Sequence, residues 1–495
     1  MKTTNKLGLQ SLNLEHFFVI IGLIFGIWIV LLNPPFHSAD EERHFYDAYA
    51  LADGQFIFSN IEGKKGKFLP KRLVESASSL WQFPFHAGHK MNDQMLEEEL
   101  NKPLNPDEKV LYRKYNYKRN PIPYLPHAIG ILAGKLIREN TVFILWAGRI
   151  AGLIFYLALM YYAIRLMPIA KSLLFLYGLT PIVLFQGASV NYDMMNNALG
   201  FLMLAMALDY TYREGQLDLK KIAAFVIIAL VHAFTKNGYF LIPFVFLIIP
   251  RNKLGPVWKM LVIAALLAFV YFAADLIWDS AVKKQLKNPE KNEQISDKKE
   301  ARESLKAGSK DDNRKGKTNE FWLQQRDFYF NPKMNIERAK EDPFKYGELL
   351  FRNIMYFKNE WTHGIVGRFG HSYLQFPDFI VIFHILILIS AAFLDSNPEK
   401  PLNIRQKAII GGIGVLTGLM IIGGVFLMAS PVGAHMIFGF QGRYLIPVVP
   451  MILILAYSSG FRLEWWHKWR GLIVPVYASI FLLYTVIYMQ NYFYE

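Results

Sequence analysis

The chain has 495 residues, of which 53% are hydrophobic, and its mean hydropathy of +0.20 is too high for an ordinary soluble enzyme. The net charge of +14 indicates basic loops that face anionic lipid headgroups. Nucleic-acid binding is not indicated, because the sequence has no module that combines basic and aromatic residues in the way such binding requires. The sequence contains no cysteine, which excludes disulfides, thiolate metal sites and thiol nucleophiles.

Apolar runs separated by short basic loops predict an all-α, polytopic integral membrane protein, a single domain over residues 1–495. We expect about eleven transmembrane helices, at 16–33, 141–166, 172–190, 192–210, 221–235, 239–250, 257–278, 373–394, 408–429, 444–459 and 471–490. The basic N-terminus is placed in the cytoplasm, and the alternation of spans then leaves the C-terminus outside.

Two long outer loops interrupt the spans, at 34–124 and 279–372. The first ends in a proline-broken apolar piece at about 122–138, which we interpret as an interfacial helix. In the second, residues 283–320 carry mixed charge and few apolar residues, which predicts a solvated, flexible segment. The sequence becomes amphipathic and aromatic from Phe321 onward, and we expect that part to lie on the membrane surface.

The segment 33–54, directly after the first apolar run, predicts a short helix with an acidic start. Ser38 and Glu41 fit a capping box, and Gly54 fits a C-terminal stop. Four apolar residues recur at helical spacing and form a face suited to a membrane or a protein surface: Phe45, Ala48, Tyr49 and Ala52.

The acidic start of this helix is the main candidate for chemistry. Asp40 or Glu41 could serve as a general base, or orient an acceptor hydroxyl, at the outer membrane face. The alternative is a capped and solvated helix, in which Glu41 is occupied by the cap. His44 lies one turn after Asp40, where it positions a phosphate or a sugar or simply hydrogen-bonds its neighbours.

Charged residues also lie at the predicted outer ends of several spans: Arg149, Asp193, Lys236, Arg368 and Arg443. Ionisable groups at membrane depth are costly and mark functional sites, whereas snorkelling to headgroups is the structural alternative. Arginine and lysine are also the residues that a lipid-linked phosphate requires. Lys236 and Arg443 stand out because neighbouring glycines allow a close backbone approach, and Asp193 could pair with one of these cations.

Metal-binding and nucleotide-binding signals are weak. His86, His89 and Asp93 have only loosely metal-like spacing, so we predict no metal site from them. A requirement for a divalent cation is an open alternative, and no cofactor is assigned. No P-loop, G-x-S-x-G or H-E-x-x-H pattern occurs in a supporting context.

Two motifs resemble those of a bacterial multi-pass membrane family of unknown function. Asp40-Glu41, His44-Phe45, Ala48-Tyr49 and Ala52-Asp53-Gly54 resemble the family's first outer loop, and Gln441-Gly442-Arg443-Tyr444 with Pro447 and Pro450 resembles its late segment. In that family the acidic pair follows the double proline directly, whereas here residues 36–39 intervene.

The family looks like GT-C glycosyltransferases, which transfer a sugar from a polyprenyl-phosphate carrier outside the bacterial plasma membrane. The resemblance implies Asp40 and Glu41 as catalytic carboxylates. We expect substrate contacts from a second set: His44, Asp193, Lys236, Arg368, Gln441, Arg443 and Tyr444. The expected partners are the polyprenyl-phosphate-sugar donor, a cell-surface glycan, polymer or protein acceptor, and membrane lipids. The alternatives are a lipid-linked oligosaccharide polymerase or ligase, a lipid-glycan transporter, and a non-catalytic assembly subunit.

Overall fold

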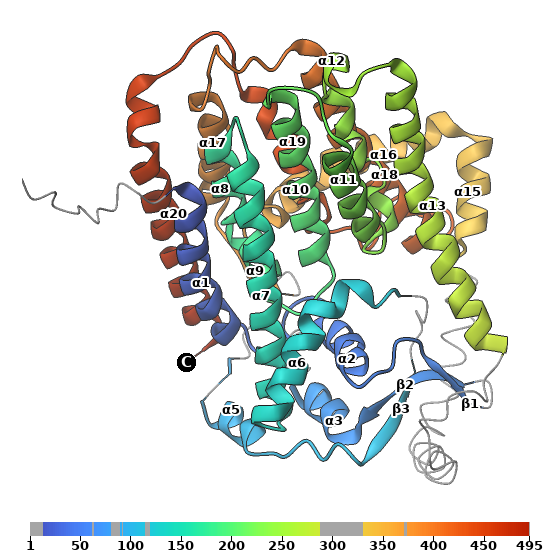
Figure 1. Ribbon diagram of the computed structural model, residues 1–495. Helices are drawn as coiled ribbons and strands as arrows, with labels where there is room; N and C mark the ends of the chain where they lie inside the picture. The colour runs from blue at the N-terminus through green and yellow to red at the C-terminus, as the bar shows by residue number, and fades with distance from the viewer. Residues whose placement is uncertain are drawn as a thin grey trace, which may run out of the picture.

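The computed structural model describes residues 13–61, 64–80, 90–91, 93–113, 119–287, 330–370 and 374–494. Most of these residues are helical, and the helices form a bundle with a second layer beneath one of its ends (Figure 1). This second layer consists mainly of the first long loop. The bundle and the loop layer meet where the candidate site lies.

Among the described residues, five helices are long and apolar enough to cross a membrane: α1 (Leu14–Leu32), α7 (Thr141–Leu166), α13 (Val257–Lys287), α18 (Ile404–Ala429) and α20 (Glu464–Phe493). The prediction of a membrane protein with several apolar helices is therefore confirmed. Central contacts join α7 to α1, to α6 (Leu125–Ile137) and to α10 (Asp193–Tyr212). The bundle also contains two shorter helices, α11 (Leu219–Ala233) and α17 (Asp378–Leu394).

Three of the spans that the sequence predicts as continuous helices are broken. The pieces are α8 (Lys171–Gly178) and α9 (Pro181–Gly187); η3 (Asn237–Tyr239), η4 (Ile242–Ile248) and α12 (Arg251–Leu254); and η6 (Gly442–Leu445), α19 (Val449–Leu453) and η7 (Ile454–Ala456). Proline has no N–H to donate and ends a helical ladder, and Pro181, Pro243 and Pro450 lie within the first turns of these pieces. Broken backbone is tolerated at membrane depth only where protein or water surrounds it.

The first long loop contains a small sheet, so the all-α prediction is wrong in this region. Strands β1 (Ser59–Ile61), β2 (Lys64–Pro70) and β3 (Lys109–Arg113) pair antiparallel in that order, with Gly66 opposite Arg113. Helices α3 (Lys71–Leu80) and α5 (Asp93–Leu100) and the turn η2 (Ile122–Tyr124) connect the sheet to the bundle. Strand β2 reads KKGKFLP, which lacks the alternation that identifies a half-buried strand.

Helix α2 (Glu41–Ala52) is the predicted opening helix, and its apolar face packs against protein instead of lipid. Phe45, Ala48 and Tyr49 are completely buried, and α2 contacts α6 and β2. The predicted capping box is wrong. Asp40 is the N-cap residue, its side chain makes no capping hydrogen bond, and Glu41 faces the interior.

The second long loop continues from α13 into residues outside the described part, which include most of the predicted flexible segment 283–320 and nearly all of 321–330. It resumes with α15 (Pro332–Glu341), α16 (Pro343–Gly364) and a two-stranded hairpin of β4 (Arg368–Phe369) and β5 (Leu374–Gln375). Helix α16 leaves Phe344, Phe351 and Tyr356 largely exposed, as an amphipathic surface helix does.

Candidate active site

Glu41 and Arg149 form a completely buried ion pair, which we call the anchor pair. Arg149 Nε lies 2.8 Å from Glu41 Oε1, and Nη2 lies 2.5 Å from Oε2, in the parallel geometry that guanidinium and carboxylate groups prefer. The remaining Arg149 donors are satisfied by carbonyl oxygens at the end of α1 and just beyond it: Val30, Asn33 and Pro34. The backbone N–H of Val190 also donates to Glu41. Four separate segments are thereby fixed around the start of α2.

The residue directly before this anchor has an unusual backbone. Asp40 adopts the left-handed region with φ 59°, and Phe36 does so with φ 63°. Aspartate tolerates this conformation, but for a bulky residue it costs about 1–3 kcal/mol and persists only where the surroundings enforce it. Phe36 is buried against Phe45, and the two reversals bound the short turn that leads into α2. Asp40 keeps 44% of its side chain exposed, whereas Glu41 keeps none.

Asp40 contacts Arg443, which connects it through Asp193 to Lys236; we call these four residues from distant parts of the chain the charge cluster. Arg443 Nη2 is 3.9 Å from Asp40, and its Nη1 is 3.9 Å from Asp193. Lys236 Nζ is 3.3 Å from the other Asp193 oxygen. Distances of 3.9 Å are ion-pair contacts but not hydrogen bonds. Within the described part of the chain, the terminal nitrogens of Arg443 make no hydrogen bond, so they retain donors for an anion.

The segment Gln441–Tyr444 fixes Arg443 in this position. Arg443 Nε donates to the side chain of Gln441 at 2.6 Å, and the carbonyl of Tyr444 accepts from Tyr239 at 2.8 Å. Gly442 is pressed against the end of α16, since a Cβ there would lie 2.1 Å from the Trp361 carbonyl oxygen. The structure thus shows a close backbone approach at Gly442, whereas a Cβ at Gly238, beside Lys236, would meet only Ile421 at 3.6 Å.

Lys236 is surrounded by aromatic rings as well as by Asp193. Its Nζ lies 4.1 Å from the centre of the Tyr444 ring and 5.1 Å from that of Tyr192, distances typical of cation–π contacts. Burial alone would lower the pKa of Lys236, but Asp193 and the surrounding tyrosines outweigh it and hold the pKa well above its ordinary value. The lysine is therefore a permanent cation at neutral pH.

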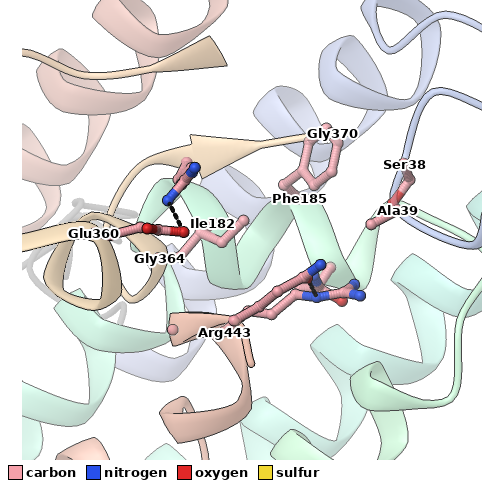
Figure 2. A pocket seen from close by; sticks show the side chains of 12 residues that line it. Ser38, Ala39, Ile182, Phe185, Glu360, Gly364, Gly370 and Arg443 are labelled. Carbon is pink, nitrogen blue, oxygen red and sulfur yellow. Dashed lines mark hydrogen bonds and ion pairs between the residues drawn. The ribbon is translucent and has the colours of Figure 1, made fainter. Parts of the chain in front are cut away.

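Two cavities border the charge cluster. The larger, of about 540 Å³, is lined by Lys236, Arg119, Tyr192 and Trp278, and it lies between the loop layer and the ends of α11 and α13. The smaller is lined by Arg443, Arg368 and Gln186 and holds about 20 Å³, room for about one water (Figure 2). The larger cavity is thus the one with space for a substrate, and its lining has two cations, Lys236 and Arg119, against one carboxylate, Asp275.

Arg119 is a functional candidate that the sequence interpretation missed, since it lies in a generally basic stretch of a long loop. Its Nη1 lies 3.7 Å from Asp47 and 3.4 Å from His44, and its guanidinium faces the Tyr192 ring at 5.7 Å. His44 also lies 2.7 Å from the Tyr124 hydroxyl and is buried. His44 therefore positions Arg119 and Tyr124 and lies outside the charge cluster.

Most of the predicted site residues lie together, and Arg368 lies apart from them. The structure brings together Asp40, Asp193, Lys236, Gln441, Arg443 and Tyr444. Arg368 lies on the smaller cavity, paired with Glu360 at 2.7 Å, and Figure 2 shows Glu360 on the side opposite Ser38. Among the described residues no group of three or more His, Asp or Glu could hold a metal ion, and His86 and His89 lie outside them.

A family model described as "Predicted membrane protein (DUF2142)" matches residues 23–452. The chain belongs to this family. The matched region contains the whole charge cluster and the anchor pair, and the predicted membership of a membrane family without an assigned function is confirmed. No curated protein and no solved structure matches the chain.

Proposed function

We propose that this DUF2142 protein is a glycosyltransferase that moves a sugar from a polyprenyl-phosphate-linked donor to a cell-surface glycan, polymer or protein. The observation that carries the proposal is Asp40, a half-exposed carboxylate 3.9 Å from Arg443, whose terminal nitrogens make ion-pair contacts but no hydrogen bonds among the described residues. A base and a phosphate-binding cation side by side are what transfer from a sugar phosphate requires. The resemblance to GT-C enzymes supports the same assignment.

In this reaction Asp40 accepts the proton of the acceptor hydroxyl while the hydroxyl oxygen forms a bond to the anomeric carbon. The bond between that carbon and the phosphate oxygen breaks, and the carrier leaves as a polyprenyl phosphate with one additional negative charge. Arg443 and Lys236 stabilise this developing charge, with Arg443 supplying a fork of donors and Lys236 a point charge. Gln441 and Tyr444 hold the two cations in place.

The larger cavity suits the donor. Its lining combines Arg119 and Lys236 with Tyr124, Tyr192 and Trp278, and aromatic faces of this kind stack on sugars. The cavity borders the end of α13, where Leu276 and Ile277 are exposed and give an apolar path for an isoprenoid chain. We place this end of the bundle outside the bacterial plasma membrane, with a cytoplasmic N-terminus, where nucleotide sugars are absent and a lipid carrier is the natural donor.

Glu41 is excluded from the base role in this proposal, although the resemblance implies it. Both of its oxygens are occupied by Arg149 and Val190 at complete burial. It acts as a positioning residue for Asp40. A divalent cation has no assigned step.

The substitution Asp40→Asn tests the proposal. Membranes containing the protein are incubated with undecaprenyl phosphate carrying radiolabelled glucose, mannose or N-acetylglucosamine, and label in the acceptor fraction is measured. Asp40→Asn should lower transfer by about 10²–10⁴-fold, the usual contribution of a general base. Glu42→Gln, one residue into the same helix, is the matched control and should transfer normally. Activity near wild type in Asp40→Asn contradicts the role of Asp40.

A lipid-glycan transporter is the second candidate, favoured by the three broken elements, since transporters commonly place such breaks at their substrate sites. Reconstituted vesicles distinguish the two. A transporter moves a fluorescent polyprenyl-linked sugar across the bilayer without transferring it, and Asp40→Asn would then affect flipping only. A polymerase or ligase would show the same Asp40 dependence with a lipid-linked acceptor. An assembly subunit would show neither activity.

A further inference from the structure

A second polar cavity lies at the opposite end of the bundle from the charge cluster. It has a volume of about 450 Å³ and is formed where α1 and α20 begin, near the start of α8 and the turn after α17. Helix α1 has 19 residues, so this end is about 28 Å from Asn33 and the anchor pair. Five cationic side chains line the cavity: Lys171, Lys400, Arg462, Lys468 and Arg470.

Two carboxylates also line this basic cavity, and one of them is already fully engaged. Asp395 is buried and accepts hydrogen bonds from the backbone and hydroxyl of Ser172, from the indole of Trp466 and from Arg470 at 3.0 Å. This network joins α8 to α20 and orients Arg470. Asp395 therefore serves the architecture of the cavity, and one engaged carboxylate does not balance its cations.

The second carboxylate, Glu15, lies 3.5 Å from Lys171. Arg462 is paired at the rim with Glu399 and Glu464, whereas Lys400 donates a hydrogen bond to the carbonyl of Pro168. Burial lowers the pKa of Lys171 and outweighs Glu15, which raises it, while the nearby charges of Arg470 and Lys400 contribute smaller decreases. The cations are thus close enough to repel one another, and an anion among them would relieve that repulsion.

The position of the cavity relates it to the membrane surface. The first two turns of α20 leave Trp465, Trp469 and Leu472 about half exposed, as aromatic residues at a lipid–water interface commonly are. Beyond them Ile473 and Val476 are also exposed along the same helix. An anion held in the cavity would have an apolar helix surface beside it for attached acyl chains.

We propose that the basic cavity binds the phosphate headgroup of an anionic membrane phospholipid. Lysine and arginine side chains supply charge-assisted donors to the phosphate, and basic pockets between transmembrane helices are suited to such headgroups. The adjacent exposed surface of α20 favours a lipid over a soluble phosphate, since a soluble ion would gain nothing from it. This site is independent of the transferase proposal.

Native mass spectrometry of the purified full-length protein tests the proposal. The protein is titrated with phosphatidylglycerol and, separately, with phosphatidylcholine carrying the same acyl chains, and the bound fraction of each lipid is compared. We expect tighter binding of phosphatidylglycerol to the wild type. The double substitution Lys400→Gln/Lys468→Gln should weaken that binding by roughly 5-fold per charge removed. It leaves Asp395 and its partners intact.

The matched control is Lys220→Gln/Lys259→Gln, which removes two exposed lysines at the starts of α11 and α13, at the same end of the bundle. Its phosphatidylglycerol binding should equal that of the wild type. Equal binding of the two lipids, or an equal loss in both double variants, overturns the proposal. A parallel titration with inorganic phosphate decides whether the ligand is a lipid or a soluble anion. If phosphate binds at the same concentrations as phosphatidylglycerol, the site is one for a soluble anion and the lipid assignment is overturned.

Discussion

The anchor pair and the charge cluster use adjacent carboxylates in opposite ways. Glu41 has complete burial, contacts of 2.5–3.0 Å and no remaining capacity for a ligand. Asp40 is half exposed, and the contacts that join it to Arg443 and then to Asp193 are 3.9 Å long. A site for a charged substrate needs both arrangements, because loosely paired groups stay available only when rigid neighbours hold them in place.

The comparison also explains the left-handed backbone at Asp40. Neighbouring side chains of an α-helix already point about 100° apart, because the helix has 3.6 residues per turn. The reversal at φ 59° takes Asp40 out of the helix, where it stays half exposed beside Arg443, while the next residue, Glu41, enters the interior. The contacts of the anchor pair hold α2 in place directly after this reversal.

The largest expected effect comes from breaking the anchor pair. Arg149→Met should destabilise the protein by about 3–5 kcal/mol, because Glu41 would remain buried without a partner. The measurement is the temperature at which the purified protein loses its monodisperse elution peak. The double variant Glu41→Gln/Arg149→Met removes the unpaired carboxylate and should recover part of the loss. A single variant as stable as the wild type would show that the anchor is dispensable.

The next effect comes from the charge cluster and concerns binding. Arg443→Lys keeps the charge but loses the fork of donors, so the affinity for undecaprenyl phosphate should fall by about 10–100-fold, as expected for hydrogen bonds to a charged group. Stability should change little. Arg43→Lys is the control, since Arg43 also lies near Asp40, at 3.6 Å, but with 60% of its side chain exposed. Equal losses in both variants would assign the effect to general charge.

A smaller loss is expected at Lys236. Lys236→Gln removes a point charge without disturbing the Arg443 fork, and it should weaken undecaprenyl phosphate binding by about 3–10-fold. The loss should shrink as the salt concentration rises. Lys109→Gln, which removes a lysine already bonded to Asp53, provides the comparison. A salt-independent loss would indicate that the lysine acts through packing.

The smallest effect concerns Glu42, whose pKa is raised by burial despite the opposing influence of Arg43 and Tyr46. The folded state then binds the proton more tightly than the unfolded state, so the contribution of Glu42 to stability falls as pH rises from its ordinary pKa through its folded value. Glu42→Gln should flatten this fall and leave the protein at least as stable at pH 7. Thermal stability measured from pH 4 to pH 8 checks this, and a steeper fall in the variant would contradict it.

The sequence predicted the parts of the site that depend on local pattern. Helix α2, its apolar face and the close approach at Gly442 follow from periodicity, residue size and spacing. The partner of Glu41 did not, because it lies 108 residues away and any of several cations could have been chosen. Nothing in the sequence distinguished Arg119 from the other basic residues of its stretch.

The broken spans were missed for a related reason. Hydropathy measures how apolar a segment is, and the pieces of the third and tenth predicted spans are as apolar as continuous helices. Proline at residues 181 and 450 was the available signal, yet transmembrane helices also tolerate proline, as α20 does at Pro475. Tertiary contacts decide between these outcomes.

The separation between Glu41 and Arg149 also affects how the protein is made. Ribosomes add about 5–20 residues per second, so Glu41 emerges roughly 5–20 s before its partner, which lies 108 residues later. During that interval the carboxylate must remain hydrated, and α2 cannot take its final position. Arg443 follows only when 52 of the 495 residues remain to be added. A chain truncated before Arg443 therefore lacks a complete charge cluster, and under the proposed function it could not act on a carrier lipid.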